Sequence, residues 1–149
     1  MNSILFLLSG MLLFANLAFA QQSPVTWNGS INKMEDGTYE VSIEAKIESG
    51  WYVYSRVLES DMGPVPTSLD FSANDGIQLV GSTSESGNRQ EGMDKAFGMN
   101  VVKYLDEVTF SQKVQISSDI DQIQCTVTFM TCNGEMCLPP KDVPIRINL

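Results

Sequence analysis

Apolar and polar residues alternate with a period of two along much of the chain. The clearest run covers residues 38–48, where the apolar positions are Tyr39, Val41, Ile43, Ala45 and Ile47. Charged or small polar residues occupy the positions between them, which predicts a strand with one buried face. Similar runs predict further strands over residues 21–30, 51–55, 67–71, 77–80, 108–116, 123–131 and 143–149.

The connections between these runs favour an antiparallel arrangement. Ser49-Gly50 separates two predicted strands and is typical of a hairpin turn, whereas Gly63-Pro64-Val65-Pro66 interrupts regular pairing. Residues 81–95 are the most polar stretch and indicate either an exposed loop or an irregular sheet edge. No segment after residue 20 has a convincing helical period. About seven to nine short strands with Gly, Pro and Asn turns predict an all-β chain, an immunoglobulin-like antiparallel β-sandwich.

The first 20 residues differ from the rest. They contain no charged side chain, are rich in Leu, Phe, Ala and Met, and end in Ala18-Phe19-Ala20, a small-x-small cleavage pattern. We therefore expect residues 1–20 to be a cleaved signal peptide and residues 21–149 to be one exported domain. The alternative is an uncleaved membrane anchor, because the apolar run of residues 4–20 is close to spanning length.

Composition narrows the possible functions. All 18 acidic and nine basic residues follow Ala20, so the predicted domain carries the whole net charge of −9. A domain this acidic is not expected to bind nucleic acid or an anionic membrane surface. The chain has no histidine, which removes the usual general base and most zinc chemistry.

All three cysteines lie in the stretch from Cys125 to Pro140. Cys125 has the parity of the apolar positions of its predicted strand, so we expect it to be a buried core thiol. Cys132 falls on the opposite parity at the strand's end, and Asn133-Gly134 is a strong turn signal that lets the chain return and bring Cys137 near it. A reversible Cys132–Cys137 disulfide is therefore predicted in the loop between the last two strands, in the oxidising compartment that export implies.

Such a disulfide has two interpretations, a structural staple or a site of thiol exchange. Closing a loop of about six residues stabilises a domain by only roughly 2 kcal/mol in the chain-entropy model. A tight pair beside Gly134 and two prolines is well placed for attack by an external thiolate. Neither sulfur has an evident activating charge, since only Glu135 and Lys141 lie nearby in sequence. The pair is thus expected to serve as the electrophile for a partner's thiolate.

These residues carry a resemblance to a known family. Thr126-Val127-Thr128-Phe129 before Cys132, Cys137-Leu138-Pro139-Pro140-Lys141 after the turn, and Gly50-Trp51-Tyr52-Val53-Tyr54 resemble the N-terminal periplasmic domain of the thiol:disulfide interchange protein DsbD. Asp94-Lys95-Ala96-Phe97-Gly98 resembles that family's cap loop. The likeness covers nearly all of residues 21–149.

The resemblance implies an immunoglobulin-like fold in the periplasm whose disulfide passes electrons from a membrane or thioredoxin-like donor to periplasmic proteins. It implies that Cys132 and Cys137 are the catalytic pair, that Cys137 forms the mixed disulfide, and that Phe97 and Asp94 belong to the cap. Tyr52 and Tyr54, which alternate with Trp51 and Val53, are expected to help shield the pair. No cofactor or stable metal is implied. The family's membrane-spanning and thioredoxin-like parts have no counterpart here, so we expect the domain to work with separate proteins.

The sequence departs from the family pattern at two points, and two alternative functions fit the same residues. Four residues separate Cys132 from Cys137 where five are expected in better-known members, and Ala96 stands where the shielding Phe is expected, with Phe97 beside it. The first alternative is Cu(I) binding, because Met130 and Met136 add soft thioether ligands near the cysteines. The second is a non-redox interaction module with a structural disulfide.

Overall fold

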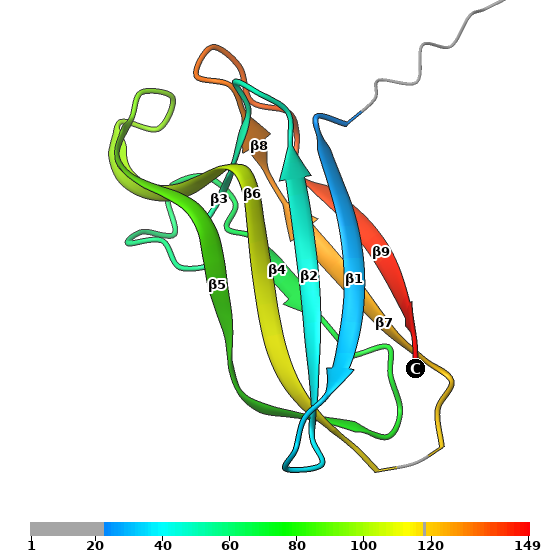
Figure 1. The fold of residues 1–149 in the computed structure, drawn as a ribbon. Helices are drawn as coiled ribbons and strands as arrows, with labels where there is room; N and C mark the ends of the chain where they lie inside the picture. The colour runs from blue at the N-terminus through cyan, green and yellow to red at the C-terminus, as the bar shows by residue number, and fades with distance from the viewer. Residues whose placement is uncertain (1–22, 118) are drawn as a thin grey trace, which may run out of the picture.

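The computed structural model describes residues 23–117 and 119–149, and the predicted signal peptide lies outside the described residues. Nine strands form two antiparallel sheets, which confirms the all-β prediction (Figure 1). The larger sheet contains β1 (Val25–Lys33), β2 (Tyr39–Ile47), β3 (Tyr52–Tyr54), β5 (Ile77–Asp94), β6 (Met99–Ile116) and β8 (Thr131–Cys132). The smaller sheet contains β4 (Ser68–Asp70), β7 (Gln122–Phe129) and β9 (Lys141–Asn148). No helix in the described ranges is long and apolar enough to cross a membrane.

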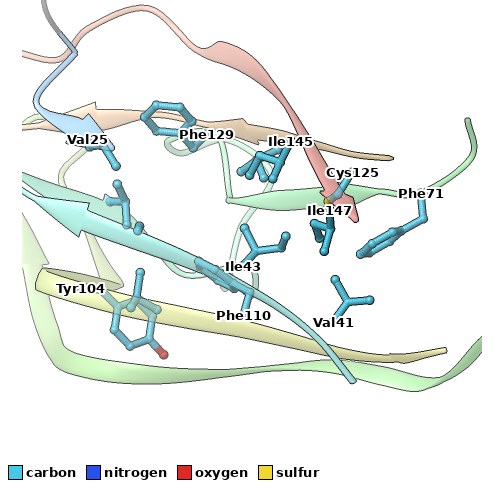
Figure 2. Close-up of a cluster of buried hydrophobic side chains, with 14 of the residues drawn as sticks. Val25, Val41, Ile43, Phe71, Tyr104, Phe110, Cys125, Phe129, Ile145 and Ile147 are labelled. Carbon is cyan, nitrogen blue, oxygen red and sulfur yellow. The ribbon is translucent and has the colours of Figure 1, made fainter. Parts of the chain in front are cut away.

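The main core fills the space between the two sheets (Figure 2). The alternating apolar positions of β2 and β7 face it, so Val41, Ile43, Val127 and Phe129 are buried, as the period-two pattern predicts. Cys125 lies fully buried in the same core as a free thiol, which confirms its predicted position. Burial raises the pKa of this thiol to about 12, with a further contribution from the charge of Asp70.

The two sheets approach each other closely at Gly29 of β1. A methyl group at this position would lie 2.6 Å from Cγ1 of Ile147 and 2.8 Å from Cγ2 of Ile145, both on β9. Glycine therefore allows the first strand of one sheet to pack against the last strand of the other.

The long strand β6 organises the larger sheet. One edge pairs with β5 along almost its whole length, while the other pairs first with β3 and then with β2. The change of partner coincides with a bulge, where Asp106 has a positive φ of 60° and accepts a hydrogen bond of 2.7 Å from Asn88. Gly87 permits this bulge because a methyl group there would collide with the Glu107 carbonyl oxygen.

Three sequence predictions of elements need correction. Residues 38–48 and 51–55 do not form a hairpin, because β2 pairs with β1 and β6 whereas β3 pairs with β6 and β8. The predicted strand over residues 123–131 divides into β7 and β8, which belong to different sheets. The predicted strand over residues 108–116 begins much earlier, at Met99.

The polar stretch over residues 81–95 is mostly strand β5 and forms the irregular edge, not the exposed loop. Its register shifts between Val80 and Ser84. There the buried amide of Gln112 accepts a hydrogen bond from Thr83 and donates to the carbonyls of Val80 and Gly81. Side-chain hydrogen bonding thus holds a polar strand at the sheet edge without an apolar pattern.

Candidate functional site

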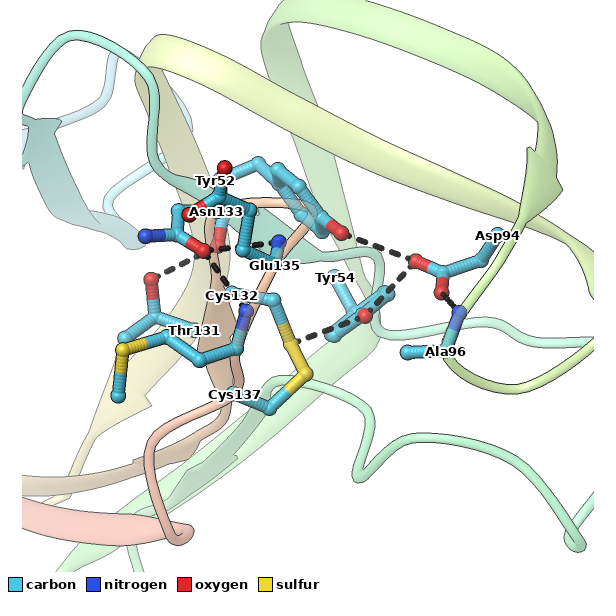
Figure 3. The surroundings of a disulfide bond; sticks show 10 residues. Tyr52, Tyr54, Asp94, Ala96, Thr131, Cys132, Asn133, Glu135 and Cys137 are labelled. Atoms are coloured by element: carbon cyan, nitrogen blue, oxygen red, sulfur yellow. Dashed lines mark hydrogen bonds between the residues drawn. A yellow bond between two sulfur atoms is a disulfide. The ribbon is translucent and has the colours of Figure 1, made fainter.

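The two cysteines lie where the chain crosses between the sheets. β7 ends at Phe129 in the smaller sheet, and three residues later Cys132 pairs with Tyr52 in the larger sheet. Cys137 returns to form an isolated antiparallel bridge and a disulfide with Cys132, with 4.1 Å between their Cα atoms. The predicted pairing of Cys132 with Cys137 is therefore present in the structure (Figure 3).

The turn between the cysteines is held by its own hydrogen bonds. The Asn133 side chain accepts from the amides of Glu135 (3.0 Å) and Met136 (2.9 Å), and the Asn133 amide donates to the Met136 carbonyl. Gly134 takes the positive φ of 88° that this turn requires. Just outside the turn, the Leu138 amide donates to the backbone carbonyl of Thr131. Because these bonds do not involve sulfur, they can hold the turn when the disulfide is open.

The disulfide belongs to a second apolar cluster on the face of the larger sheet that points away from the main core. The residues of this disulfide cluster come from β3, β6, β8 and the loops around them: Tyr52, Tyr54, Leu58, Phe97, Met99, Val101, Leu105, Met130, Cys132 and Cys137. Val53 faces the main core instead, so Tyr52 and Tyr54 do alternate away from it as predicted. Both tyrosines are buried rather than exposed.

The two sulfurs differ in accessibility. Cys132 is fully buried, since it pairs with Tyr52 on the neighbouring strand and packs in the same cluster as Tyr52 and Tyr54. Cys137 is partly exposed, and the exposed Pro139 and Pro140 follow it. A reagent from solvent therefore meets Cys137 before Cys132.

Asp94, at the end of β5, joins the disulfide to the cap loop. Its carboxylate is 2% exposed and accepts hydrogen bonds from the hydroxyls of Tyr54 (2.9 Å) and Tyr52 (3.2 Å) and from the Ala96 amide (2.9 Å) (Figure 3). The Gly98 amide closes the cap turn by donating to the Asp94 backbone carbonyl. Asp94 thus holds the cap loop and both tyrosines in one network.

The Tyr54 hydroxyl lies between this carboxylate and the disulfide. Its oxygen is 3.2 Å from Sγ of Cys132 and 2.9 Å from the carboxylate of Asp94. A single hydroxyl hydrogen cannot serve both acceptors fully, and the carboxylate is the stronger one. Burial, followed by the hydrogen bond to Asp94, raises the pKa of Tyr54 far above its ordinary value, so the phenol stays protonated.

The Tyr52 hydroxyl is the second donor to Asp94. Burial is also the main cause that raises the pKa of Tyr52 above its ordinary value. Lys103 lies over its ring, with Nζ 3.9 Å from the ring centre, and fixes this side chain by a cation–π contact. Sequence patterns did not point to Lys103, although its position opposite Tyr54 on the neighbouring strand follows once β3 and β6 are known to pair.

Phe97 comes from the connection between β5 and β6, at the same end of the molecule as the loop after β8 (Figure 1). It packs against the disulfide cluster, and its ring is edge-on to Tyr54 with 6.2 Å between ring centres. The predicted shielding residues Phe97, Asp94, Tyr52 and Tyr54 are therefore brought together around the cysteines. Leu58, which also packs in the cluster, was not predicted because its loop shows no periodic pattern.

The two methionines of the copper alternative lie in different surroundings. Met130 packs in the disulfide cluster, whereas Met136 is 52% exposed. Over residues 23–117 and 119–149, no group of three or more His, Cys, Asp or Glu side chains is arranged to hold a metal ion.

Comparison with known proteins bears on both fold and chemistry. The family described as "Thiol:disulfide interchange protein DsbD, N-terminal" matches residues 21–148. No curated protein sequence matches the chain significantly. Among solved structures, the reduced N-terminal domain of DsbD from Neisseria meningitidis is 20% identical, with a TM-score of 0.54 and 84% of each chain covered. The N-terminal periplasmic domain of ScsB from Proteus mirabilis is 22% identical, with a TM-score of 0.57, covering 84% of this chain and 45% of that one. Both likenesses support the immunoglobulin-like fold.

Proposed function

The chain belongs to the family of the N-terminal domain of the thiol:disulfide interchange protein DsbD, a family of thiol–disulfide exchange domains, and we propose that it relays reducing equivalents between proteins in the periplasm. The donor is a membrane protein or a thioredoxin-like protein, and the acceptors are periplasmic proteins with disulfides. Residues 21–149 act as the exported domain after removal of residues 1–20.

The observation that carries this proposal is the unequal exposure of the two cysteines, in a turn stabilised by its own hydrogen bonds. Cys137 is partly exposed while Cys132 is fully buried. The hydrogen bonds of the turn through Asn133 do not involve sulfur, so they support the turn when the disulfide opens. A structural staple is a weaker explanation, because closing a loop of about six residues stabilises a domain by only about 2 kcal/mol in the chain-entropy model.

Reduction follows in two steps. A donor thiolate attacks Sγ of Cys137, the Cys132–Cys137 bond breaks, and a mixed disulfide joins the donor to Cys137 while Cys132 leaves and is protonated. A second donor thiolate then attacks the donor's own sulfur in the mixed disulfide. This step releases the Cys137 thiolate, and two electrons have passed from the donor to the Cys132–Cys137 pair.

Oxidation by the acceptor reverses this order. The Cys137 thiolate attacks the acceptor's disulfide, forms a mixed disulfide and releases one acceptor thiolate. Cys132 then gives up its proton and attacks Sγ of Cys137, which releases the second acceptor thiolate and restores the starting disulfide. The Tyr54 hydroxyl is positioned to hydrogen-bond the Cys132 sulfur when the disulfide is open. The cap residue Phe97 limits access to the pair until a partner docks.

Trapping tests the proposal and its assignment of roles. In the Cys132→Ala variant, Cys137 should hold a thioredoxin-like partner as a stable mixed disulfide, detected on a non-reducing gel and by mass spectrometry. The Cys137→Ala variant should trap little partner, because Cys132 is buried. Cys125→Ala is the matched control and should exchange like the wild type.

Three results would count against the proposal. Equal trapping by both variants would overturn the roles of the two cysteines. Failure of a thioredoxin-like donor to reduce the native disulfide would favour a structural staple. Stoichiometric Cu(I) binding by the reduced pair without exchange would favour the copper alternative.

A further inference from the structure

A second loop covers the disulfide cluster besides the cap loop. The segment of residues 56–66 connects β3 to β4 and contributes Leu58 to the cluster. At Gly63 its backbone lies against Met99, since a methyl group on Gly63 would be 2.5 Å from Sδ of Met99. The segment therefore packs directly against the group of side chains that contains Cys132 and Cys137.

The two ends of this loop are tied together by buried polar groups. Thr67 donates through its hydroxyl to the Tyr54 carbonyl (2.6 Å) and through its amide to the Ser55 carbonyl (3.3 Å). Ser55 and Thr67 are both 1% exposed. The Ser55 hydroxyl oxygen also accepts from the Val57 amide at 3.0 Å, which sets the direction in which the loop leaves β3.

One charged residue attaches this closed loop to the sheet. Glu85 of β5 accepts hydrogen bonds from the Ser55 hydroxyl and from the Arg56 amide, the latter at 3.0 Å. Glu85 also lies near the Tyr104 hydroxyl, where its charge adds to burial in raising the pKa of Tyr104 to about 12. A partly buried carboxylate with several donors is a strong anchor, because hydrogen bonds to charged groups are stronger than those between neutral groups.

We propose that Glu85 is a positioning residue for disulfide exchange, holding the loop of residues 56–66 against the disulfide cluster as a second cover beside the cap loop. This inference rests on the proposed function, since a cover on the disulfide has a role only if thiols exchange there. Glu85 contacts neither sulfur and acts through Ser55 and Arg56. The cap and this loop approach the cluster from different connections, so they limit access independently.

The test measures reduction of the native disulfide by dithiothreitol, a small thiol that needs no docking surface. Glu85→Gln should raise the second-order rate of reduction about fivefold or more. This is the factor expected when the closed loop loses about 1 kcal/mol of stability relative to the open loop. Glu44→Gln on β2 is the matched control, with the same loss of charge, and should react at the wild-type rate. A Glu85→Gln rate equal to that of the control would overturn the proposal.

Two double variants test whether Glu85 acts through this loop. Leu58→Ala removes the apolar contact of the loop, so combining it with Glu85→Gln should give no more than the faster single variant. Phe97→Ala opens the cap instead, and its effect should multiply with that of Glu85→Gln. Multiplication in both cases, or in neither, would contradict the assignment of Glu85 to this loop.

Cys125 reports whether the effect is local. It lies in the main core, so it should stay protected from alkylation in Glu85→Gln while the disulfide reacts faster. Parallel gains in Cys125 labelling and disulfide reduction would mean general loosening of the fold and would overturn a positioning role.

If Glu85→Gln does not fold, Ser55→Ala removes the hydrogen bond from the Ser55 hydroxyl to Glu85 and decides by the same criteria. A wild-type disulfide that resists dithiothreitol until Cys125 is exposed would refute the proposed exchange function itself, a result distinct from any difference between variants.

Discussion

Replacing Asp94 with Asn should accelerate reduction of the Cys132–Cys137 disulfide by a small thiolate. The carboxylate of Asp94 accepts three hydrogen bonds, from Tyr52, Tyr54 and the Ala96 amide. The attacking thiolate brings negative charge to the disulfide, and this charge is shared among three sulfurs in the transition state. A buried carboxylate beside the leaving sulfur therefore raises the barrier, and Asn removes the charge while an amide oxygen can still accept from Tyr52 and Tyr54.

The structure sets the size of the effect. The distances of 2.9 Å and 3.2 Å that meet at the Tyr54 hydroxyl place a carboxylate oxygen of Asp94 no more than about 6 Å from Sγ of Cys132. At an effective dielectric constant near 20, two full charges at that distance repel by about 3 kcal/mol. About a third of the charge falls on Cys132, so the barrier should fall by about 1 kcal/mol and the rate should rise about fivefold.

Stopped-flow reduction with dithiothreitol at a constant pH near 7.5, at low and high salt, measures this rate. The acceleration should persist at high salt, because a buried pair is poorly screened. Tyr52→Phe is the control: it removes one donor to Asp94 but keeps the charge, so its effect should be smaller. A rate for Asp94→Asn at or below the wild-type value would refute the reasoning, as would an equal acceleration by Tyr52→Phe, which would assign the effect to a looser cap.

Three further predictions concern the cap residue Phe97, the buried thiol and phenol groups, and the contact between the sheets at Gly29. Phe97→Ala should speed reduction by dithiothreitol several-fold; an unchanged rate would place the cover elsewhere. The pKa values of Cys125 and Tyr104 are raised to about 12 by burial, and that of Tyr54 is raised further. Above about pH 8.5 the unfolded chain therefore binds fewer protons than the folded one, and urea unfolding should show stability falling as pH rises towards 12, whereas a rise would contradict these shifts. Gly29→Ala should lower the free energy of unfolding by about 1–3 kcal/mol because its methyl group meets two isoleucines of β9; a loss of only a few tenths would mean that β9 moves away freely.

The sequence by itself determined the class of fold and the pairing of Cys132 with Cys137. Period-two alternation over residues 38–48 and 108–116 marks positions that the structure buries, such as Ile43 and Phe110. Such alternation is local information, because successive side chains of a strand point to opposite faces. Strand parity in the same way placed Cys125 in the core, and the Asn133-Gly134 turn brought Cys137 to Cys132. Family likeness added Asp94 and Phe97 through their short cap motif.

Pairing between distant strands was decided only by the tertiary structure. Nothing local distinguishes a hairpin of β2 and β3 from the observed pairing of β3 with β6 and β8, since the turn residues Ser49-Gly50 suit both. The break of the predicted strand at Met130 likewise depends on which sheet offers a free edge. The polar pattern of β5 could not show a strand, because its stability comes from pairing with β6 and from the hydrogen bonds of Gln112 and Glu85.

The same limit applies to the site. Tyr54, Asp94 and Cys132 are separated by 40 and 38 positions in the chain, yet one hydroxyl lies within 3.2 Å of both the carboxylate and the sulfur. That meeting requires β3 to lie between β6 and β8 and the β5–β6 connection to fold back over them. Sequence patterns record which face each residue takes on its own strand, whereas the distances between strands are set by the packing of the whole sandwich.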